Sequence, residues 1–224
     1  MFIQEPTFCR LFVIHTMSFL RKLLDPRFRE DDILKVNYSM ILILDNLDSF
    51  TFNISQETRK CGYECVVKRA SETSLADIEK LSPQKIIFSP GPGRPSDHPF
   101  MYQVMEYFSD RIPILGICLG MQAMNEFFGG TICKDDRPMH GKTSSIFHND
   151  SMLFHGIPSS CEVARYHSLK IDQLATSFIL TAWTADRIPM AMSHHTKNLY
   201  GVQFHPESFL TPYGNQMLLN FYRS

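Results

Sequence analysis

From Met40 onward, short apolar runs alternate with segments of helical character. The first unit begins with the apolar run Ile41 to Leu44, of the kind found in buried strands, and a polar loop then leads into a helical stretch over residues 50–60. Further strands are predicted at 65–67, 85–88 and 113–117, and further helices at 75–81, 100–108 and 119–128. Alternation at this spacing predicts an α/β fold, with a mainly parallel open sheet, helices on both faces and right-handed crossovers.

After Gly129 and Gly130 the segments become shorter and richer in β-forming residues. Strands are predicted at 143–147, 162–166, 178–184, 190–193 and 199–204, with a closing helix over 213–222. We expect either a small antiparallel β extension of the main sheet or a small second sheet in this part. Because 44% of the residues are hydrophobic, the chain can bury one sizeable core, and we predict one continuous domain over residues 40–224.

Residues 1–39 lack the alternating strand and helix pattern of the rest of the chain. Charged residues interrupt the apolar stretch between Phe8 and Leu24, so no uncharged run reaches the roughly 18 residues that a membrane-spanning helix needs. A charged stretch from Asp25 to Asp32 stands where a secretory cleavage site would lie, and its acidic residues argue against a mitochondrial presequence. We expect an N-terminal extension that is a disordered tail, a partner-binding arm or upstream sequence included by a start-site error, and we favour the last.

The charge balance and the cysteines exclude several classes of function. With 22 basic and 23 acidic residues the net charge is -1, which gives no electrostatic reason to expect nucleic acid or a membrane surface as partner. The six cysteines are scattered and form no CxxC pair, which favours a reducing cytoplasm. Cys61 and Cys65 lack the second pair that would complete a zinc site, and the histidines are dispersed, so we predict no metal.

Cys118 stands between a predicted strand and a predicted helix, in the pentapeptide Gly116-Ile117-Cys118-Leu119-Gly120. A nucleophile on a sharp strand-to-helix turn needs small neighbours, because the backbone there is strained and closely approached. Such a turn would expose the sulfur, and the positive end of the helix dipole would favour the thiolate. A buried cysteine beside two packing glycines explains the pentapeptide equally well.

His205, Pro206 and Glu207 follow the last predicted strand. Residues two apart in an extended chain face the same way, and Pro206 is expected to hold this stretch extended, so that the Glu207 carboxylate can orient the His205 imidazole. Alone, such a pair is more often a solvated turn. Together with a cysteine at the same edge of the sheet, it supplies a base and its orienting group to a nucleophile.

Glycines alternate with prolines in the loop Ser89 to Pro95, which follows a buried strand. Such a loop is stiff but leaves its backbone N–H groups unobstructed, which suits an oxyanion hole or close contact with a ligand. We take the N–H groups of Gly91 and of Leu119, the residue after the cysteine, as candidate oxyanion donors. A plain turn is the alternative.

Three of these segments together resemble one enzyme family. The motifs SPGPG (89–93), GICLGMQ (116–122) and HPES (205–208) are similar to those of the triad-type, or class I, glutamine amidotransferases. The resemblance implies Cys118 as nucleophile, His205 as base and then acid, and Glu207 as orienting group. It implies contacts with L-glutamine at Gly91, Pro92, Gly93, Leu119, Gln122, Ser168 and Leu169. Gln122 follows Cys118 by four residues, so both project from one helix face. No metal or organic cofactor is needed for this reaction.

Other segments narrow the resemblance. The motifs DNLDSFT (45–51), MHGKTS (139–144) and RYHSL (165–169) resemble those of the subunits that feed anthranilate synthase and aminodeoxychorismate synthase. This likeness implies a separate chorismate-binding synthase chain as partner, with the segment 140–142 toward it, in tryptophan synthesis, folate synthesis or both. Leu47 replaces the aromatic residue usual in that family, and Ser193 replaces a basic one.

Several alternatives stay open at this stage. Lys142 is equally explained as a solvated lysine, and Ser49 as a cap of the first helix. Within the family, GMP synthetase and carbamoyl-phosphate synthetase are the rivals. Outside it, a stand-alone cysteine hydrolase of γ-glutamyl or peptide substrates would use the same triad, and a regulatory subunit with a relic site would not use it.

Overall fold

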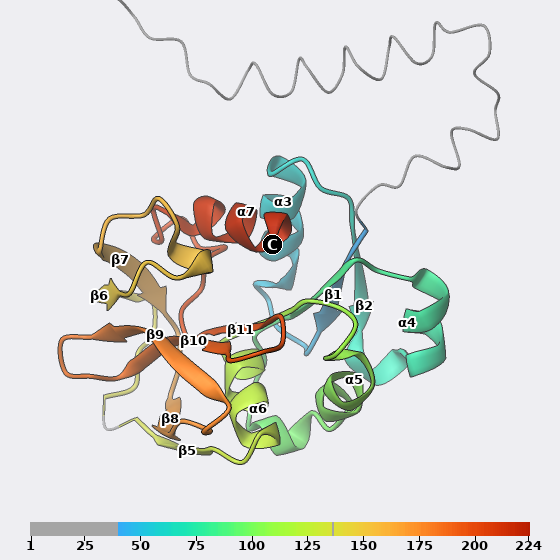
Figure 1. Ribbon diagram of the computed structural model, residues 1–224, viewed down its shortest axis with the longest axis horizontal. Coiled ribbons are helices and arrows are strands. Elements are labelled where there is room, and N and C mark those ends of the chain that lie inside the picture. The colour runs from blue at the N-terminus through green and yellow to red at the C-terminus, as the bar shows by residue number, and fades with distance from the viewer. Residues whose placement is uncertain (1–39, 136) are drawn as a thin grey trace, which may run out of the picture. The chain divides into compact units, whose positions relative to one another are not determined.

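The computed structural model describes residues 40–135 and 137–224 (Figure 1). The extension predicted over residues 1–39 lies outside the described residues. Within them, nine strands form one sheet in the order β2-β1-β3-β4-β11-β10-β9-β6-β7. The bounds are β1 (Ile41–Asp45), β2 (Cys65–Arg69), β3 (Lys85–Phe88), β4 (Ile114–Ile117), β6 (Lys142–His148), β7 (Ser160–Arg165), β9 (Phe178–Thr184), β10 (Pro189–His194) and β11 (Leu199–Val202).

The first five strands of this order pair in parallel, as the alternating pattern predicts. All residues of β1, β3 and β4 are buried, which explains why these strands are continuous apolar runs. Helices cover both faces of this half of the sheet. They are α3 (Thr51–Lys60), α4 (Leu75–Leu81), α5 (Phe100–Phe108), α6 (Leu119–Phe127) and α7 (Gly214–Arg223). The predicted α/β fold is therefore confirmed.

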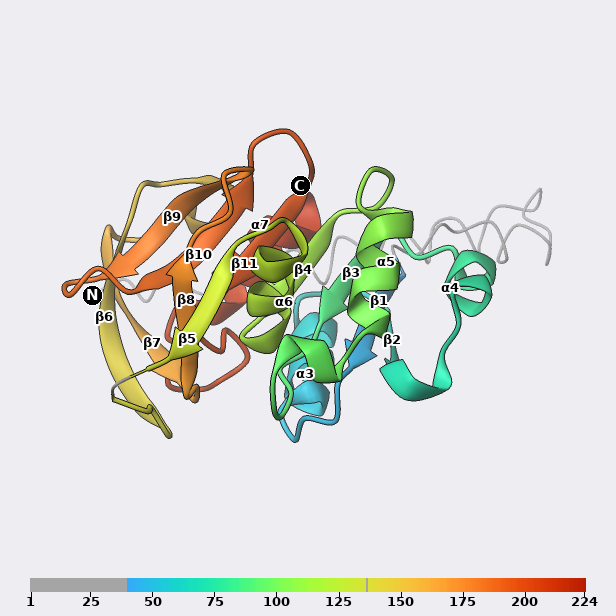
Figure 2. The same ribbon diagram turned by 90° about the horizontal axis from the view of Figure 1, so that it is seen from below.

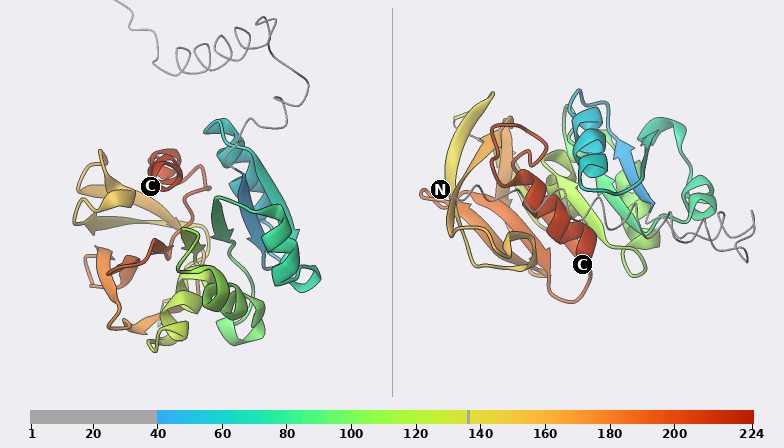
Figure 3. Two further views of the ribbon diagram at one scale, coloured as in Figure 1. Left: turned by 45° about the vertical axis from the view of Figure 1, so that its right-hand side comes forward. Right: turned by 90° about the horizontal axis from the view of Figure 1, so that it is seen from above.

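Alternate residues of β1 enter two separate apolar cores. Ile41 and Ile43 face the core that contains residues of α3 and α7, and Leu42 and Leu44 face the core of α4, α5 and α6. Accordingly, Figure 2 shows α5 and α6 in front of the sheet and α7 behind it, and Figure 3 shows α7 and α3 on the same side. A hydrogen bond of 2.7 Å between the hydroxyls of Thr58 and Tyr222 joins these last two helices.

The remaining strands pair antiparallel: β10 with β11, β9 with β10, and β6 with both β9 and β7. Two strands that the sequence did not predict, β5 (Thr131–Lys134) and β8 (Leu169–Gln173), form a separate antiparallel sheet within the described residues. The antiparallel extension and the small second sheet are thus both present. β5 and β8 escaped prediction because each mixes polar with apolar residues and is partly exposed.

Ser49 does not cap the first helix, α3, although the sequence left this alternative open. Phe50, not Ser49, is the residue before α3, and it makes no side-chain cap hydrogen bond. Aspartate oxygens accept there instead: Asp48 Oδ1 from the Phe50 N–H at 2.7 Å, and Asp45 Oδ1 from the Thr51 hydroxyl at 2.7 Å. Carboxylates suit this position because the helix N-terminus carries partial positive charge. Across residues 40–135 and 137–224, no helix is long and apolar enough to span a membrane.

Candidate active site

Cys118 occupies a strained turn between β4 and α6. Its backbone angles, φ 52° and ψ -99°, are rare for a residue with a side chain and cost about 1 to 3 kcal/mol. The neighbouring glycines are sterically required. A Cβ atom on Gly116 would lie 2.4 Å from the carbonyl carbon of Gly120, and one on Gly120 would lie 2.8 Å from the Cβ of Phe88. The sharp elbow predicted from the pentapeptide is therefore confirmed.

The elbow does not expose the sulfur, however. Cys118 is only 7% exposed, so the prediction of an exposed sulfur is wrong. Side chains that follow β11 lie against the sulfur, because the Cys118 N–H donates to Val202 O at 2.7 Å and so draws the two segments together. One of these side chains is Gln203, whose Nε2 lies 3.5 Å from the Cys118 sulfur.

His205 and Glu207 pair through a turn and not through extended chain. β11 ends at Val202, and the Ser208 N–H donates to His205 O at 3.2 Å, which closes a turn over Pro206 and Glu207. Proline is favoured at the second position of such turns because its φ is already set. The predicted contact forms: His205 Nδ1 and Glu207 Oε1 are 2.6 Å apart. The extended geometry expected for it is wrong.

Two further contacts hold this turn in place. The Thr211 hydroxyl donates to His205 O at 2.7 Å and accepts from the Ala164 N–H at 3.0 Å. At the start of α7, a Cβ atom on Gly214 would lie only 1.8 Å from Pro206 O. The end of the chain that closes the domain therefore also supports the histidine.

The surroundings of His205 set its protonation. The residue is 2% exposed, and burial by itself lowers the pKa of the imidazole; the Glu207 carboxylate and the neighbouring Cys118 outweigh burial and raise that pKa well above its usual value. Because Nδ1 is engaged by Glu207, Nε2 is the nitrogen left without a hydrogen-bond partner among the described residues. His205 can therefore accept a proton at Nε2.

Aromatic rings pack around the histidine. The rings of Phe50 and Tyr166 lie 5.2 and 4.9 Å from the His205 ring and 4.9 Å from each other. Their apolar edges limit how far the imidazole can turn. Sequence reasoning assigned neither residue a role, although both stand within the family-like motifs.

The glycine–proline loop packs against the beginning of α6. A Cβ atom on Gly91 would lie 2.6 Å from Leu119 Cδ2 and 2.7 Å from Asn46 O, so only glycine fits. Asn46 also donates from its backbone to Ser89 Oγ at 2.9 Å and from its side chain to Ser89 O at 3.1 Å, which ties the loop to the end of β1. The two candidate oxyanion donors are thus neighbours, and Leu119 opens a helix, where backbone N–H groups have no partner in the helix itself.

The rest of this loop is held by local contacts. Pro92 O lies 2.8 Å from His98 Nε2. Gly93 has a φ of +76°, and a Cβ atom there would lie 2.4 Å from Asp97 Oδ2. These contacts restrict the conformation of the loop.

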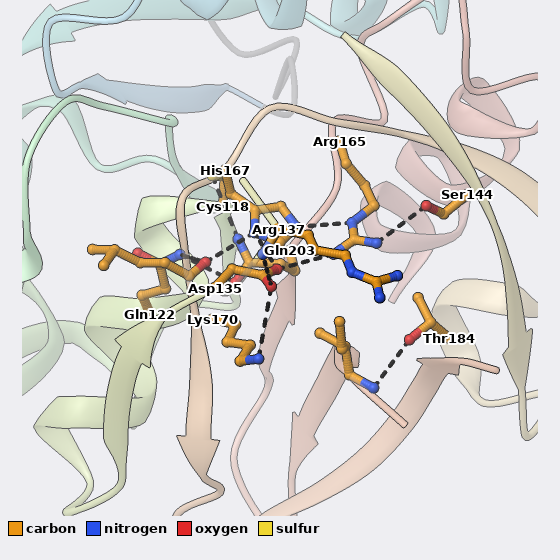
Figure 4. A network of polar contacts seen from close by, with 12 residues as sticks. Cys118, Gln122, Asp135, Arg137, Ser144, Arg165, His167, Lys170, Thr184 and Gln203 are labelled. Atoms are coloured by element: carbon orange, nitrogen blue, oxygen red, sulfur yellow. Dashed lines mark hydrogen bonds and ion pairs between the residues drawn. The ribbon is translucent and has the colours of Figure 1, made fainter. Parts of the chain in front are cut away.

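Gln122, Leu169 and Ser168 differ in their surroundings. Gln122 is buried, and its Nε2 donates to Leu169 O and to Gln203 Oε1, each at 3.1 Å (Figure 4). Ser168 is exposed, and its carbonyl accepts from the Asp135 N–H at 2.8 Å. The structure thus joins Gln122 and Leu169 directly and links them through Gln203 to Cys118. A role of these residues in holding glutamine stays a prediction.

Comparison with known proteins agrees with this geometry. The family described as glutamine amidotransferase class-I matches residues 42–224. The chain belongs to the class-I glutamine amidotransferases. It is 50% identical over 185 residues to anthranilate synthase component 2 of Pyropia yezoensis, covering 81% of this chain and 98% of the relative. It is 46% identical over 184 residues to aminodeoxychorismate synthase component 2 of Escherichia coli (strain K12), covering 81% of this chain and 98% of that relative.

A solved structure supports the same family fold for this class-I amidotransferase. A Thermoplasma acidophilum protein described as part of a GMP synthase superimposes with a TM-score of 0.73 at 26% identity, over 82% of this chain and 92% of that one. Among the residues described for this amidotransferase, no group of three or more histidine, cysteine, aspartate or glutamate side chains is placed to hold a metal ion.

This amidotransferase also contains a buried charged cluster that sequence reasoning missed. Arg165 donates from Nη2 to Asp135 Oδ2 at 3.3 Å, from Nη1 to Ser144 Oγ at 3.1 Å and from Nε to His167 Nε2 at 3.0 Å. His167 Nδ1 in turn lies 2.9 Å from Leu169 O (Figure 4). The motif RYHSL contains three of these residues, but Asp135 gives no signal because its ion-pair partners Arg165, His167 and Lys170 are 30 or more residues away.

Burial and the arginine fix the protonation of His167. Burial lowers its pKa first, the Arg165 guanidinium lowers it further, and Asp135 compensates only in part, so that the pKa falls to about 4. Because guanidinium can only donate, His167 Nε2 must accept, and the ring proton must lie on Nδ1. The ring is thus neutral near pH 7 and has one tautomer.

Proposed function

We propose that this chain is the glutaminase subunit of a chorismate-aminating synthase. It hydrolyses L-glutamine to glutamate and ammonia, and it delivers the ammonia to a separate synthase chain that makes anthranilate, aminodeoxychorismate or both. The observation that carries the proposal is the strained Cys118 elbow beside a histidine whose other nitrogen is held by Glu207 at 2.6 Å. This is the arrangement of nucleophile, base and orienting group that acyl transfer requires.

In the first half of the reaction, His205 Nε2 takes the thiol proton of Cys118, and the sulfur attacks the side-chain carbonyl carbon of glutamine. The oxyanion of the tetrahedral intermediate accepts hydrogen bonds from the N–H groups of Gly91 and Leu119, where one such donor is worth about 10²- to 10³-fold in rate. His205 then gives its proton to the departing nitrogen, the C–N bond breaks, and ammonia leaves. A glutamyl thioester remains on Cys118.

In the second half, His205 accepts a proton from a water molecule as the water oxygen attacks the thioester carbonyl. The C–S bond breaks, glutamate leaves, and the proton returns to the sulfur. Proton transfer by a positioned group contributes typically about 10²- to 10⁴-fold. The raised pKa of His205 favours the removal of the thiol proton, the step that makes the sulfur nucleophilic.

The hydrogen bonds of Gln122 restrict how it can hold the substrate. Both hydrogens of its amide nitrogen are used, by Leu169 O and by Gln203 Oε1. Only its Oε1 can therefore engage glutamine, as an acceptor for the α-ammonium group. The loop backbone from Gly91 through Pro92 to Gly93, with Ser168 and Leu169, supplies the remaining contacts of the proposed binding site.

The nature of the acceptor is supported by the relatives. Those at 50% and 46% identity are components of an anthranilate synthase and of an aminodeoxychorismate synthase, and each is covered over 98% of its length. The Thermoplasma protein described as part of a GMP synthase is more distant, at 26% identity. Chorismate chemistry on a partner chain is therefore favoured over nucleotide amination.

We also propose that residues 40–224 are sufficient for this activity, and that it takes place in the cytoplasm. The family match begins at residue 42, and the cysteines of the described residues, Cys61, Cys65, Cys118, Cys133 and Cys161, are all free thiols. Deleting residues 1–39 should leave the melting temperature and glutamate release nearly unchanged. A large loss of either, or of affinity for the synthase, would show that the extension takes part.

The decisive experiment measures glutamate release by the purified chain alone, with an anthranilate or aminodeoxychorismate synthase chain, and with that chain plus chorismate. We expect release to rise when the synthase and chorismate are present. Cys118→Ala should abolish glutamine-dependent product formation but leave synthesis from added ammonium salts intact. Equal rates under all three conditions, with steady hydrolysis of γ-glutamyl peptides, would instead favour a stand-alone hydrolase.

A further inference from the structure

The side chain of Gln203, which directly follows β11, places its Nε2 3.5 Å from the Cys118 sulfur, and the mechanism above gives it no task. We propose that Gln203 is a positioning residue that donates a hydrogen bond from Nε2 to the Cys118 sulfur and thereby stabilises the thiolate. The proposal rests on the proposed glutaminase function, in which Cys118 is the nucleophile.

The backbone fixes Gln203 beside the nucleophile. Its N–H donates to Met190 O at 2.8 Å, and the preceding carbonyl, Val202 O, accepts from the Cys118 N–H at 2.7 Å. Gln203 itself is 0% exposed, and its Nε2 lies 3.5 Å from the sulfur, within range for a hydrogen bond to so large an acceptor atom. No solvent competes for the amide at this position.

The chain of hydrogen bonds decides which end of the Gln203 amide meets the sulfur. Leu169 O is a carbonyl and can only accept, so Gln122 must present Nε2 to it. The second hydrogen of that nitrogen then points to Gln203, which must present Oε1. The Nε2 of Gln203 is therefore the atom that faces Cys118.

The hydrogen bonds at the other end of this network, made by Arg165 and His167, run in the same donor-to-acceptor direction. The guanidinium of Arg165 can only donate, so it fixes the proton of His167 on Nδ1, and that proton also points to Leu169 O. Leu169 O thus receives two donors and cannot accept a reversed Gln122 amide (Figure 4). If Gln203 were flipped, two amide nitrogens would face each other in a buried place, and each would lose an acceptor.

A donor at this position acts on the charged sulfur. When His205 removes the thiol proton, the N–H of Gln203 remains directed at the thiolate, and hydrogen bonds to charged groups are about twice as strong as those between neutral groups. The charge moves to the oxyanion during attack and returns to sulfur when the thioester is broken. Loss of the donor should therefore lower kcat more than it raises KM for glutamine.

Two variants test this role. Gln203→Glu has the same shape, keeps an acceptor for Gln122 and puts an oxygen against the sulfur, whereas Gln203→Met keeps the length and removes the donor without adding charge. The rate of Cys118 alkylation by iodoacetamide is measured against pH in each. We expect the midpoint of the profile to move up by about one pH unit in Q203M and further in Q203E, with kcat for glutamate release about 10- to 100-fold lower and KM changed by less than about threefold.

A matched control is available in α7. Asn220 is also a buried amide, and its Nδ2 donates to Leu153 O and His155 O at 2.9 Å each, away from the nucleophile. Asn220→Asp should lower the melting temperature but leave the alkylation midpoint and kcat at their wild-type values. This separates a role at the sulfur from the general cost of changing a buried amide.

The outcomes are distinct. The proposal would be overturned if the folded Gln203 variants kept the alkylation midpoint of the wild type and had kcat values within about twofold of it. If Q203E does not fold, Q203M alone decides, because it carries no charge. If the wild-type chain releases no glutamate even with a synthase and chorismate, the proposed function fails, but the alkylation profiles still report whether Gln203 acts on the sulfur.

Discussion

His205 and His167 are almost equally buried, at 2% and 3% exposure, yet their surroundings drive them in opposite directions. His205 meets the carboxylate of Glu207, and its pKa is raised well above the usual value against the effect of burial. His167 meets the guanidinium of Arg165, which adds to burial, and its pKa falls to about 4. The sign of the neighbouring charge, not the depth of burial, distinguishes the two.

This difference separates a reactive histidine from a structural one. His205 has one nitrogen without a hydrogen-bond partner among the described residues, and it can gain and lose a proton there. Both nitrogens of His167 are engaged, one as acceptor from Arg165 and one as donor to Leu169 O. In the folded protein, therefore, His167 is suited to hold a fixed arrangement and His205 to move protons.

The largest expected effect comes from removing the charge that distinguishes His205. In Glu207→Gln the carboxylate no longer opposes burial, so the pKa of His205 falls and the orientation of the ring is less well fixed. Glutamate release should drop by about 10²- to 10⁴-fold, while synthesis from ammonium salts continues. Glu162→Gln, which neutralises an exposed glutamate on β7, is the control and should remain fully active. If the activity of Glu207→Gln stayed within a few fold of wild type, the charge of Glu207 would not be what makes His205 reactive.

The second effect concerns His167 and the dependence of stability on pH. Its pKa is about 4 in the folded protein and about 6.5 when unfolded, so the unfolded chain binds more protons between these values. The free energy of unfolding should therefore fall as the pH is lowered from 6.5 towards 4, by up to about 3 kcal/mol from this residue. Denaturant unfolding at several pH values measures it.

His167→Gln should remove this contribution, so that its stability changes less with pH in the same window, even if it is less stable at neutral pH. His155→Gln, at an exposed histidine, should keep the wild-type slope. Parallel curves for wild type and His167→Gln would mean that His167 titrates in the folded protein as it does in the unfolded chain.

The smallest expected effect comes from a variant that displaces His205 without changing any charge around it. An alanine methyl at position 214 would lie 1.8 Å from Pro206 O, so Gly214→Ala must displace the turn that pairs His205 with Glu207. We expect a loss of about 1 to 3 kcal/mol in stability and a roughly tenfold lower kcat, because catalysis depends on close alignment.

Gly156→Ala provides the control for this variant. Its φ of +74° makes the substitution strained, but no atom lies within 4 Å of the added methyl group. It should lose stability and keep its kcat. If Gly214→Ala also kept its kcat, charge alone would account for the behaviour of His205, and the supporting role of α7 would be dismissed.

The sequence by itself determined the parallel half of the molecule and the motifs of the site. The bounds of β3, α4 and α5 were predicted to the residue, because buried apolar runs and helical periodicity are local properties of the chain. The elbow at Cys118 could also be inferred locally, since a Cβ atom on Gly116 would meet the backbone of Gly120 within the turn itself. The pairing of His205 with Glu207 could be inferred from their spacing, although the wrong backbone geometry was expected for it.

The tertiary structure alone decided what meets the reactive sulfur and what charges surround each histidine. β5 pairs with β8 across more than 30 intervening residues, and Gln203 reaches Cys118 across 85 positions of sequence. Asp135 and Arg165 are likewise brought together only by the fold. Such contacts leave no periodic or local pattern, because a hydrogen bond or an ion pair depends on the distance between atoms in space and not on their separation along the chain.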